Sequence, residues 1–374
     1  MVTSRSRLIA HSQLVLLLIP ALTVLGGVTL AAWHGPKGMM DFHTYLAGGH
    51  DVLAGRSPYP AVDAHLLAGQ EQFVYPAPAA LLFAGLALLP GAMAGALWYA
   101  AMLGSAALAL WLVGVRDWRV YALCAATDGI VQALHVGSIT PLLMLLAAVA
   151  WRYRDKALVC GLAIALGIGL KLLLLPLIGW LLVCGRIRAA AAATAGSVVL
   201  IAGSWAAIGF AGMSDYNRTV DLLGEVLAWR GFSSRELFLA GGATMHHATI
   251  AAYAVAIGVA AIAVQARLLC FDERLVFSCF LLSALALSPV VWLNYFSLAI
   301  LCLALARPRM HPAWLLPLAL WVMPHAQSGG MLWPVVLWHG LLVAVLVQVA
   351  LAARPAPVPR PAVRVRSAGW RRLA

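Results

Sequence analysis

The chain has 374 residues, of which 63% are hydrophobic and only 10% are charged. Such a composition excludes a soluble globular domain, because no water-soluble core needs so large an apolar fraction. The formal net charge of +12 does not indicate nucleic-acid binding. Arginines dominate the cations and lie in short clusters at the ends of apolar segments, as the positive-inside rule of membrane proteins predicts.

Apolar runs of about 17 to 25 residues recur along the chain, and this length spans a bilayer. Backbone groups in lipid must be hydrogen-bonded within the chain, so these runs predict helices. We therefore predict an all-α, polytopic membrane protein with about twelve spans and one membrane-embedded domain over residues 1–353. The expected spans are residues 8–33, 73–89, 91–115, 119–134, 138–151, 156–184, 189–210, 248–266, 274–289, 291–306, 311–323 and 331–352.

The first span follows a short basic segment and is too long for the apolar part of a signal peptide. We interpret it as an uncleaved anchor with a cytoplasmic N-terminus. Residues 34–72 then form a first outer loop, whose mixture of apolar residues and glycines suits short interfacial helices. The segment 156–184 is long for one helix, and Lys171 and Pro176 mark a break in it.

Arginines at 185–188, 267–274 and 307–309 indicate the cytoplasmic side, which makes residues 211–247 a second outer loop. Two spans between Gln72 and Arg116 would put Arg116 outside, against the charge rule. A re-entrant segment near Tyr75, or a missed span, would remove the conflict. The tail, residues 354–374, is rich in arginine and proline and is expected to be cytoplasmic, either disordered or lying on anionic lipid.

Eight of the thirteen carboxylates fall in the two outer loops. They are Asp41, Asp51, Asp63, Glu71, Asp215, Asp221, Glu225 and Glu236. Histidines, aromatic residues and arginines accompany them, which suits a site for a polar substrate and suits ordinary wet loops equally well. Neither Asp-x-Asp nor closely spaced acid pairs occur, so neither a metal nor another cofactor is expected.

Three short motifs follow one another in and after the first loop, and two more come later. They are Asp41-Phe-x-x-Tyr45, Gly55-x-Ser57-Pro58-Tyr59, Phe73-x-Tyr75-Pro76, the Gly161–Pro176 segment with Lys171, and Ser288-Pro289-x-x-Trp292-x-Asn294-Tyr295. In order and spacing they resemble glycosyltransferase family 87 (GT87), bacterial polyprenyl-phosphate-mannose-dependent α-mannosyltransferases with the GT-C fold. The resemblance runs from about residue 38 to residue 306. The chain departs from the family at His135-Val136-Gly137-Ser138, where a Gly-Gln or Gly-Asn element is usual, and at Asn294, where a histidine is usual.

The resemblance implies inverting transfer of a mannosyl, or another hexosyl or pentosyl, residue from a polyprenyl-phosphate sugar to a glycolipid or glycan acceptor. The protein would be a multi-pass protein of the cell inner or plasma membrane, contacting membrane lipids, with its site on the extracytoplasmic side. A polytopic lipid or solute transporter or flippase is the alternative. Transporters carry charges at mid-membrane on broken, repeated helices, whereas only Lys171 and Asp128 are such candidates here and no repeat is visible.

With the resemblance, Asp41 is the candidate general base, although Asp also favours the N-cap of a short helix beginning at Phe42. Tyr45 shares a helical face with Asp41, and His43 does not. Lys171, a lone charge in an apolar run, either binds the donor phosphate or extends to the interface. The candidate substrate-binding residues are His43, Tyr45, Arg56, Tyr75, His135, Lys171, Trp292 and Tyr295. Each has a plainer alternative: a solvated loop or surface residue for His43 and Arg56, a helix entry for Tyr75, a partner for backbone carbonyls for His135, and an interface anchor for Tyr45, Trp292 and Tyr295.

Overall fold

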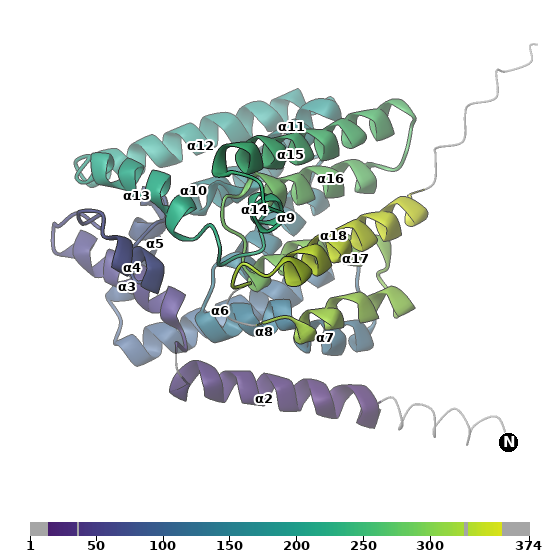
Figure 1. Cartoon of the computed structure of the whole chain (residues 1–374), viewed down its shortest axis with the longest axis horizontal. Helices are drawn as coiled ribbons and strands as arrows, with labels where there is room; N and C mark the ends of the chain where they lie inside the picture. Colours follow the sequence, from purple (N-terminus) through teal and green to yellow (C-terminus); the bar gives the residue numbers. More distant parts are fainter. Residues whose placement is uncertain (1–13, 36, 325–327, 354–374) are drawn as a thin grey trace, which may run out of the picture.

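The structure is a computed structural model of the chain, and it describes residues 14–35, 37–324 and 328–353. The regular elements of this part are all helices (Figure 1). In chain order they are η1 (Leu14–Leu18), α2 (Ile19–His34), α3 (Met40–Leu53), α4 (Ala64–Gly69), α5 (Ala77–Ala87), α6 (Gly91–Leu112), α7 (Trp118–Ala125), α8 (Asp128–Val136), α9 (Thr140–Arg152), α10 (Ala157–Leu170), η2 (Leu172–Leu174), α11 (Leu177–Val183), α12 (Ile187–Ala207), α13 (Met213–Val226), α14 (Ser234–Ala240), α15 (Met245–Leu268), α16 (Glu273–Leu287), η3 (Leu293–Tyr295), α17 (Phe296–Ala306), η4 (Pro312–Val322) and α18 (Leu332–Ala352). The predicted tail, residues 354–374, lies outside the described residues.

Five helices in the described part are long and apolar enough to cross a bilayer: Val15–His34, α6, α12, α15 and α18. Helices α8 and α9, bent by 120° at their break, make a sixth if they count as one span. The all-α, membrane-spanning architecture is therefore confirmed. The count of twelve spans stays a prediction, because the other apolar helices have only 10–17 residues.

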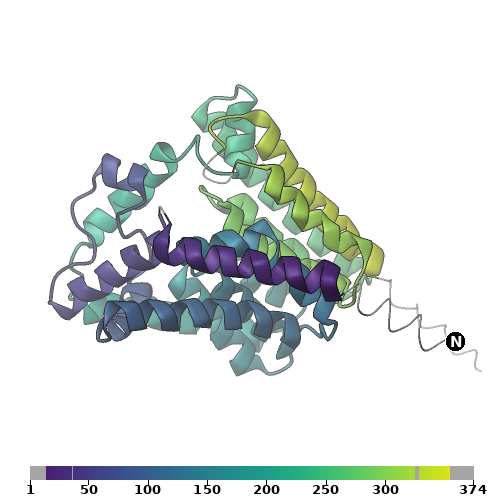
Figure 2. The same cartoon turned by 90° about the horizontal axis from the view of Figure 1, so that it is seen from below.

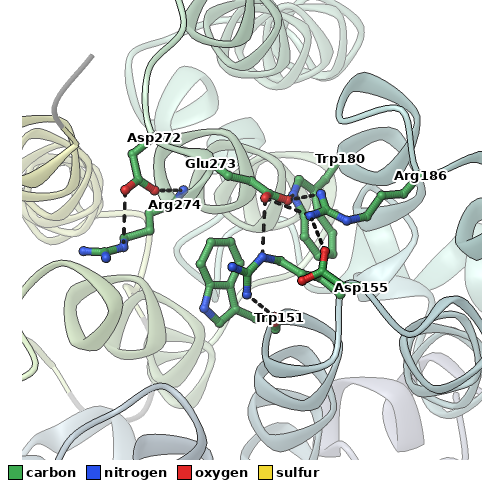
Figure 3. Close-up of polar contacts among 8 residues, drawn as sticks. Trp151, Asp155, Trp180, Arg186, Asp272, Glu273 and Arg274 are labelled. Atoms are coloured by element: carbon green, nitrogen blue, oxygen red, sulfur yellow. Dashed lines mark hydrogen bonds and ion pairs between the residues drawn. The ribbon is translucent and has the colours of Figure 1, made fainter. Parts of the chain in front are cut away.

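Ion pairs gather around Glu273 and Arg186 (Figure 3), and we call this part of the molecule the arginine end. The carboxylate of Glu273 accepts hydrogen bonds from both terminal nitrogens of Arg186 and, at 3.0 Å, from the indole N–H of Trp180. Arg154 Nε lies 3.4 Å from the same carboxylate, and Arg186 also contacts Asp155 at 3.1 Å. The cluster joins the connection between α9 and α10, the connection between α11 and α12, and the first residue of α16.

This cluster makes α10 and α11 a hairpin, since Asp155 precedes α10, Arg186 follows α11, and the two side chains touch. Lys171 lies at its apex, where the backbone leaves the helix with φ −161° and ψ 125°. The predicted break at Lys171 and Pro176 is confirmed. Because α10 has 14 residues, it is about 21 Å long, less than the roughly 30 Å of a hydrocarbon core.

Helices α16 and α17 form a second hairpin. Helix α16 begins with Glu273 at the arginine end. Leu305 and Pro308, at the far end of α17, border a hollow there that Arg154 and Arg274 also line. Its apex, residues 288–295, contains the η3 turn. Two hairpins thus begin and end at the arginine end and turn inside the helix bundle.

Helices α5 and α6 bear on the charge conflict around Arg116. Val113, directly after α6, borders the same hollow at the arginine end, whereas Gly91, the first residue of α6, lies beside the C-terminal end of α2. Helix α6 therefore traverses the bundle. Helix α5, within the expected span 73–89, has only 11 residues and packs on α3. It is one of the shorter apolar helices, so the span and its re-entrant alternative both stay predictions.

The first outer loop contains two short helices, α3 and α4, as predicted, although their lying along the membrane stays a prediction. Helices α3, α4 and α13 gather at the end of the molecule opposite the arginine end, on the left in both views (Figures 1 and 2). Tyr59 of the first loop stacks on Trp205 of α12 with ring centroids 5.0 Å apart, which fastens the loop to a spanning helix.

We expect Glu273→Gln to lower the free energy of unfolding by about 2 kcal/mol, because Arg154 and Arg186 lose their shared, partly buried carboxylate. Thermal unfolding of the detergent-solubilised protein measures this. The control is Asp272→Asn, whose ion pair with Arg274 is more exposed and whose cap of α16 an asparagine preserves. That variant should change stability by no more than about 0.5 kcal/mol, and an equal loss in both variants would contradict the role of the cluster.

Candidate functional site

A cavity of about 330 Å³ lies between α3, α13 and the two hairpin apices. Its lining contains a polar set and an apolar set. The polar set is Asp41, Thr44, Tyr45, Gln70, Gln72, Tyr75, Lys171, Tyr216, Ser288 and Tyr295. The apolar set is Leu67, Val74, Pro76, Leu172, Leu173, Leu175, Pro176, Val220, Leu223, Leu227, Ala284, Leu287, Pro289, Val290 and Trp292. Several apolar members are also exposed at the protein surface, such as Leu172 and Leu175 at 51% each. The cavity therefore has an apolar opening.

Asp41 enters this cavity from the first turn of α3. The helix begins at Met40, one residue before Asp41, and its N-cap is Met39, with φ 53° and no side-chain cap. The predicted cap role of Asp41 is therefore wrong. The reason is the backbone of Met39, whose N–H donates to the carbonyl of His135 at 2.7 Å and so starts the helix early.

The break between α8 and α9 supports the start of α3. Gly137 ends α8 with φ 71°, and a Cβ there would lie 2.8 Å from Cβ of Phe42. The indole N–H of Trp98 donates to the Gly137 carbonyl at 2.8 Å and holds the turn. The hydroxyl of the next residue, Ser138, lowers the pKa of the Asp41 carboxyl. A glycine is needed at Gly137 both for its left-handed backbone and for the close approach of α3.

The carboxylate of Asp41 is half-buried. The Tyr45 hydroxyl lies 3.4 Å from its Oδ2 and 2.9 Å from the Tyr75 hydroxyl, which confirms that Asp41 and Tyr45 share a face. Burial raises the pKa of Asp41 to about 6, and the opposing effects of Lys171 and the Tyr45 and Ser138 hydroxyls are smaller. Asp41 is thus a stronger base than an ordinary aspartate and is still mostly ionised at pH 7.

Lys171 brings a cation to the same cavity. Its ammonium contacts the Tyr295 hydroxyl and lies 4.2 Å from the ring centroid of Tyr295 and 5.1 Å from that of Tyr75. No described carboxylate lies within ion-pair distance of it. The aromatic rings hold the ammonium without neutralising it, so it remains able to bind an anion.

The structure brings together Asp41 and five of the other candidates: Tyr45, Tyr75, Lys171, Trp292 and Tyr295. It does not bring His43, Arg56 and His135 to the cavity. His43 is exposed and borders a separate hollow with His34, because two residues along a helix reverse the direction of a side chain. Arg56 pairs with Asp51 at 2.6 Å, and His135 contributes its backbone carbonyl to Met39.

The candidate residues from the sequence did not include five polar cavity residues, Thr44, Gln70, Gln72, Tyr216 and Ser288. A search centred on acids and cations passes over them. A usable signal existed, because Gln70 and Gln72 directly precede the Phe73-x-Tyr75 motif, and Thr44 lies three residues after Asp41 on the same helical face.

In a comparison with protein families, the family model described as Glycosyltransferase family 87 matches residues 73–292, more than half of the chain. This range contains Tyr75, Lys171 and Trp292, whereas Asp41 and Tyr295 lie outside it. A search of curated proteins found no match, and a search of solved structures found none either.

We expect Gly137→Ala to destabilise the protein by about 1 to 3 kcal/mol more than Gly185→Ala. Both glycines have a positive φ, 71° and 73°, so both variants acquire similar backbone strain. Only at Gly137 does the new methyl meet another residue, Phe42, since nothing lies within 4 Å of a Cβ at Gly185. Thermal unfolding of the two variants measures the difference, and equal losses would show that the contact with α3 does not matter.

Proposed function

The chain belongs to glycosyltransferase family 87, and from this premise we propose that it transfers a mannosyl residue from a polyprenyl phosphate to a glycan hydroxyl. The family and the apolar helices together identify a membrane glycosyltransferase. Another hexosyl or pentosyl residue would fit the same chemistry, and the acceptor would be a lipid-linked glycan. One observation carries the proposal: Asp41 and Lys171 line one cavity, and most of the residues that line it are apolar.

Asp41 is the general base of the proposed reaction. Inverting transfer needs a carboxylate that takes the proton of the acceptor hydroxyl while that oxygen attacks the anomeric carbon from the face opposite the phosphate. A half-buried carboxylate beside the cavity meets this requirement, and its pKa of about 6 makes it an effective proton acceptor near neutral pH. The Tyr45 and Ser138 hydroxyls would orient it.

Lys171 binds the phosphate that leaves. The transition state places growing negative charge on the departing phosphate oxygens, and a preorganised cation stabilises it. The ammonium of Lys171 is held by the Tyr75 and Tyr295 rings and has no described ion-pair partner, which supports this role. The Tyr75 and Tyr295 hydroxyls, which lie nearby, are further candidate donors.

The apolar wall accommodates the prenyl chain. Leu172 and Leu175 line the cavity and are half-exposed, as expected of residues that meet lipid at an opening. Hairpins shorter than a bilayer leave the cavity below the membrane surface, within reach of a lipid tail. By the positive-inside rule the arginine end faces the cytoplasm of a cell inner or plasma membrane, so the cavity would face the extracytoplasmic side.

We expect Asp41→Asn to lower the rate of mannosyl transfer at least about 100-fold, because the amide cannot accept the acceptor proton. The assay follows radiolabelled polyprenyl-phosphate mannose in membrane extracts. Asp51→Asn is the matched control, since Asp51 lies on the same helix but pairs with Arg56 outside the cavity. Normal turnover by Asp41→Asn would remove Asp41 from the base role, and solute transport by the wild type without glycolipid product would favour a transporter.

The pH profile provides a separate test of Asp41. Only its ionised form accepts a proton, and burial raises its pKa to about 6. We therefore expect kcat/KM to rise with pH to a plateau near pH 7 and to fall about tenfold per unit well below pH 6. Initial rates between pH 4 and pH 8 measure it. A profile that stays flat down to about pH 4 would mean that no buried carboxylate acts as the base.

A further inference from the structure

Gln70 combines an unusual backbone with a position in the cavity wall. Helix α4 ends at Gly69, and Gln70 follows with φ 61° and ψ 30°. Its N–H donates to the carbonyl of Leu67 at 3.0 Å and the next N–H donates to that of Leu66 at 2.9 Å. Glycine usually fills this helix-ending position, because a side chain strains a left-handed backbone.

Gln70 lines the same cavity as Asp41. Thr44, one turn after Asp41 on α3, donates its hydroxyl to the backbone carbonyl of Gln70 at 3.3 Å and ties the two segments together. Neither Asp41 nor any other described residue is hydrogen-bonded to the Gln70 side-chain amide, so its two donors and its acceptor are available to a ligand.

Gln72, two residues later, shows the contrast. Its side chain is buried, accepts from the N–H of Asp63 at 3.2 Å and donates to the Thr219 hydroxyl at 3.3 Å. These bonds join the first outer loop to α13, so Gln72 has a structural role. Gln70 has the same amide group without such partners. Its left-handed backbone conformation would be less strained with a glycine at this position.

We propose that Gln70 is a specificity-determining residue whose side-chain amide binds hydroxyl groups of a sugar held beside Asp41. This inference rests on the proposed transferase function and adds a residue to it. An uncharged amide that both donates and accepts matches hydroxyl groups, which also do both, better than it matches a phosphate or a prenyl chain. In the proposed function, Lys171 binds the phosphate, and the apolar lining residues contact the prenyl chain.

The backbone provides a variant that separates this role from folding. Gln70→Gly removes the amide and also relieves the left-handed strain, so the protein should be as stable as the wild type or more stable. Cys270→Gly is the matched control. Cys270 also has a left-handed backbone, φ 59°, and the same pair of helix-ending hydrogen bonds, at 3.1 and 2.9 Å, but it is exposed at the arginine end.

Titration calorimetry of the full chain in nanodiscs tests the proposal with two probes, polyprenyl-phosphate mannose and sugar-free polyprenyl phosphate. Transfer to octyl α-mannoside gives the KM of an acceptor. We expect Gln70→Gly to weaken binding of the mannose-bearing lipid about tenfold, or to raise the acceptor KM about tenfold, according to which sugar the amide contacts. Binding of the sugar-free lipid should not change, and Cys270→Gly should match the wild type throughout.

The inference is overturned if Gln70→Gly leaves both sugar-dependent values unchanged, or if it weakens the sugar-free lipid equally. It is also overturned if two results occur together. The first is that the wild type binds the mannose-bearing lipid no more tightly than the sugar-free lipid, and the second is that Gln70→Gly has the same acceptor KM as the wild type. A wild type that binds the mannose-bearing lipid more tightly but transfers nothing would refute the proposed function, while the binding titrations would still decide the role of Gln70.

Discussion

The length of the hairpin helices is the constraint on which the rest of the structure depends. Glu273 and Arg186 tie α10, α11 and α16 together at the arginine end, and α10 is too short to cross a bilayer from there. Its apex at Lys171 and the apex of the second hairpin at residues 288–295 therefore end inside the bundle. The space above them becomes the cavity, and α3, α13 and the first outer loop complete its lining.

Within that cavity the two opposite charges are kept apart. A direct ion pair between Asp41 and Lys171 would neutralise both, leaving neither a base nor an anion site. Three tyrosines lie around them instead: Tyr45 beside Asp41, Tyr295 beside Lys171, and Tyr75 within reach of both Tyr45 and Lys171. Burial raises the pKa of Asp41, while the attraction of Lys171 limits the rise. The arrangement keeps an ionised carboxylate and an unpaired ammonium close together at neutral pH.

Left-handed backbone conformations surround α3. Met39 begins it, Gly137 supports its start, and Gln70 lies across from Thr44. Only one of these three is a glycine, so two residues carry strain of about 1 to 2 kcal/mol each. Strain of this kind persists only where surrounding contacts maintain it, and it concentrates at functional sites. At Met39 the hydrogen bond to His135 maintains it, and at Gln70 the helix-ending bonds do so.

The sequence by itself determined the features that depend on local composition. Apolar run lengths predicted membrane helices, the charge of Lys171 and the ring of Pro176 predicted the break between α10 and α11, and the motif order indicated the family. Spacing along one helix was also sufficient to pair Tyr45 with Asp41.

Only the tertiary structure decided which of these residues meet. It separated His43 and Arg56 from Asp41, packed the short helix α5 on α3 and brought Gln70 to the cavity. The physical reason is that each outcome depends on contacts between segments far apart in the chain. The contact of Met39 with His135 and that of Asp155 with Arg186 fix where a helix begins and where a hairpin turns, and no local pattern of residues encodes them.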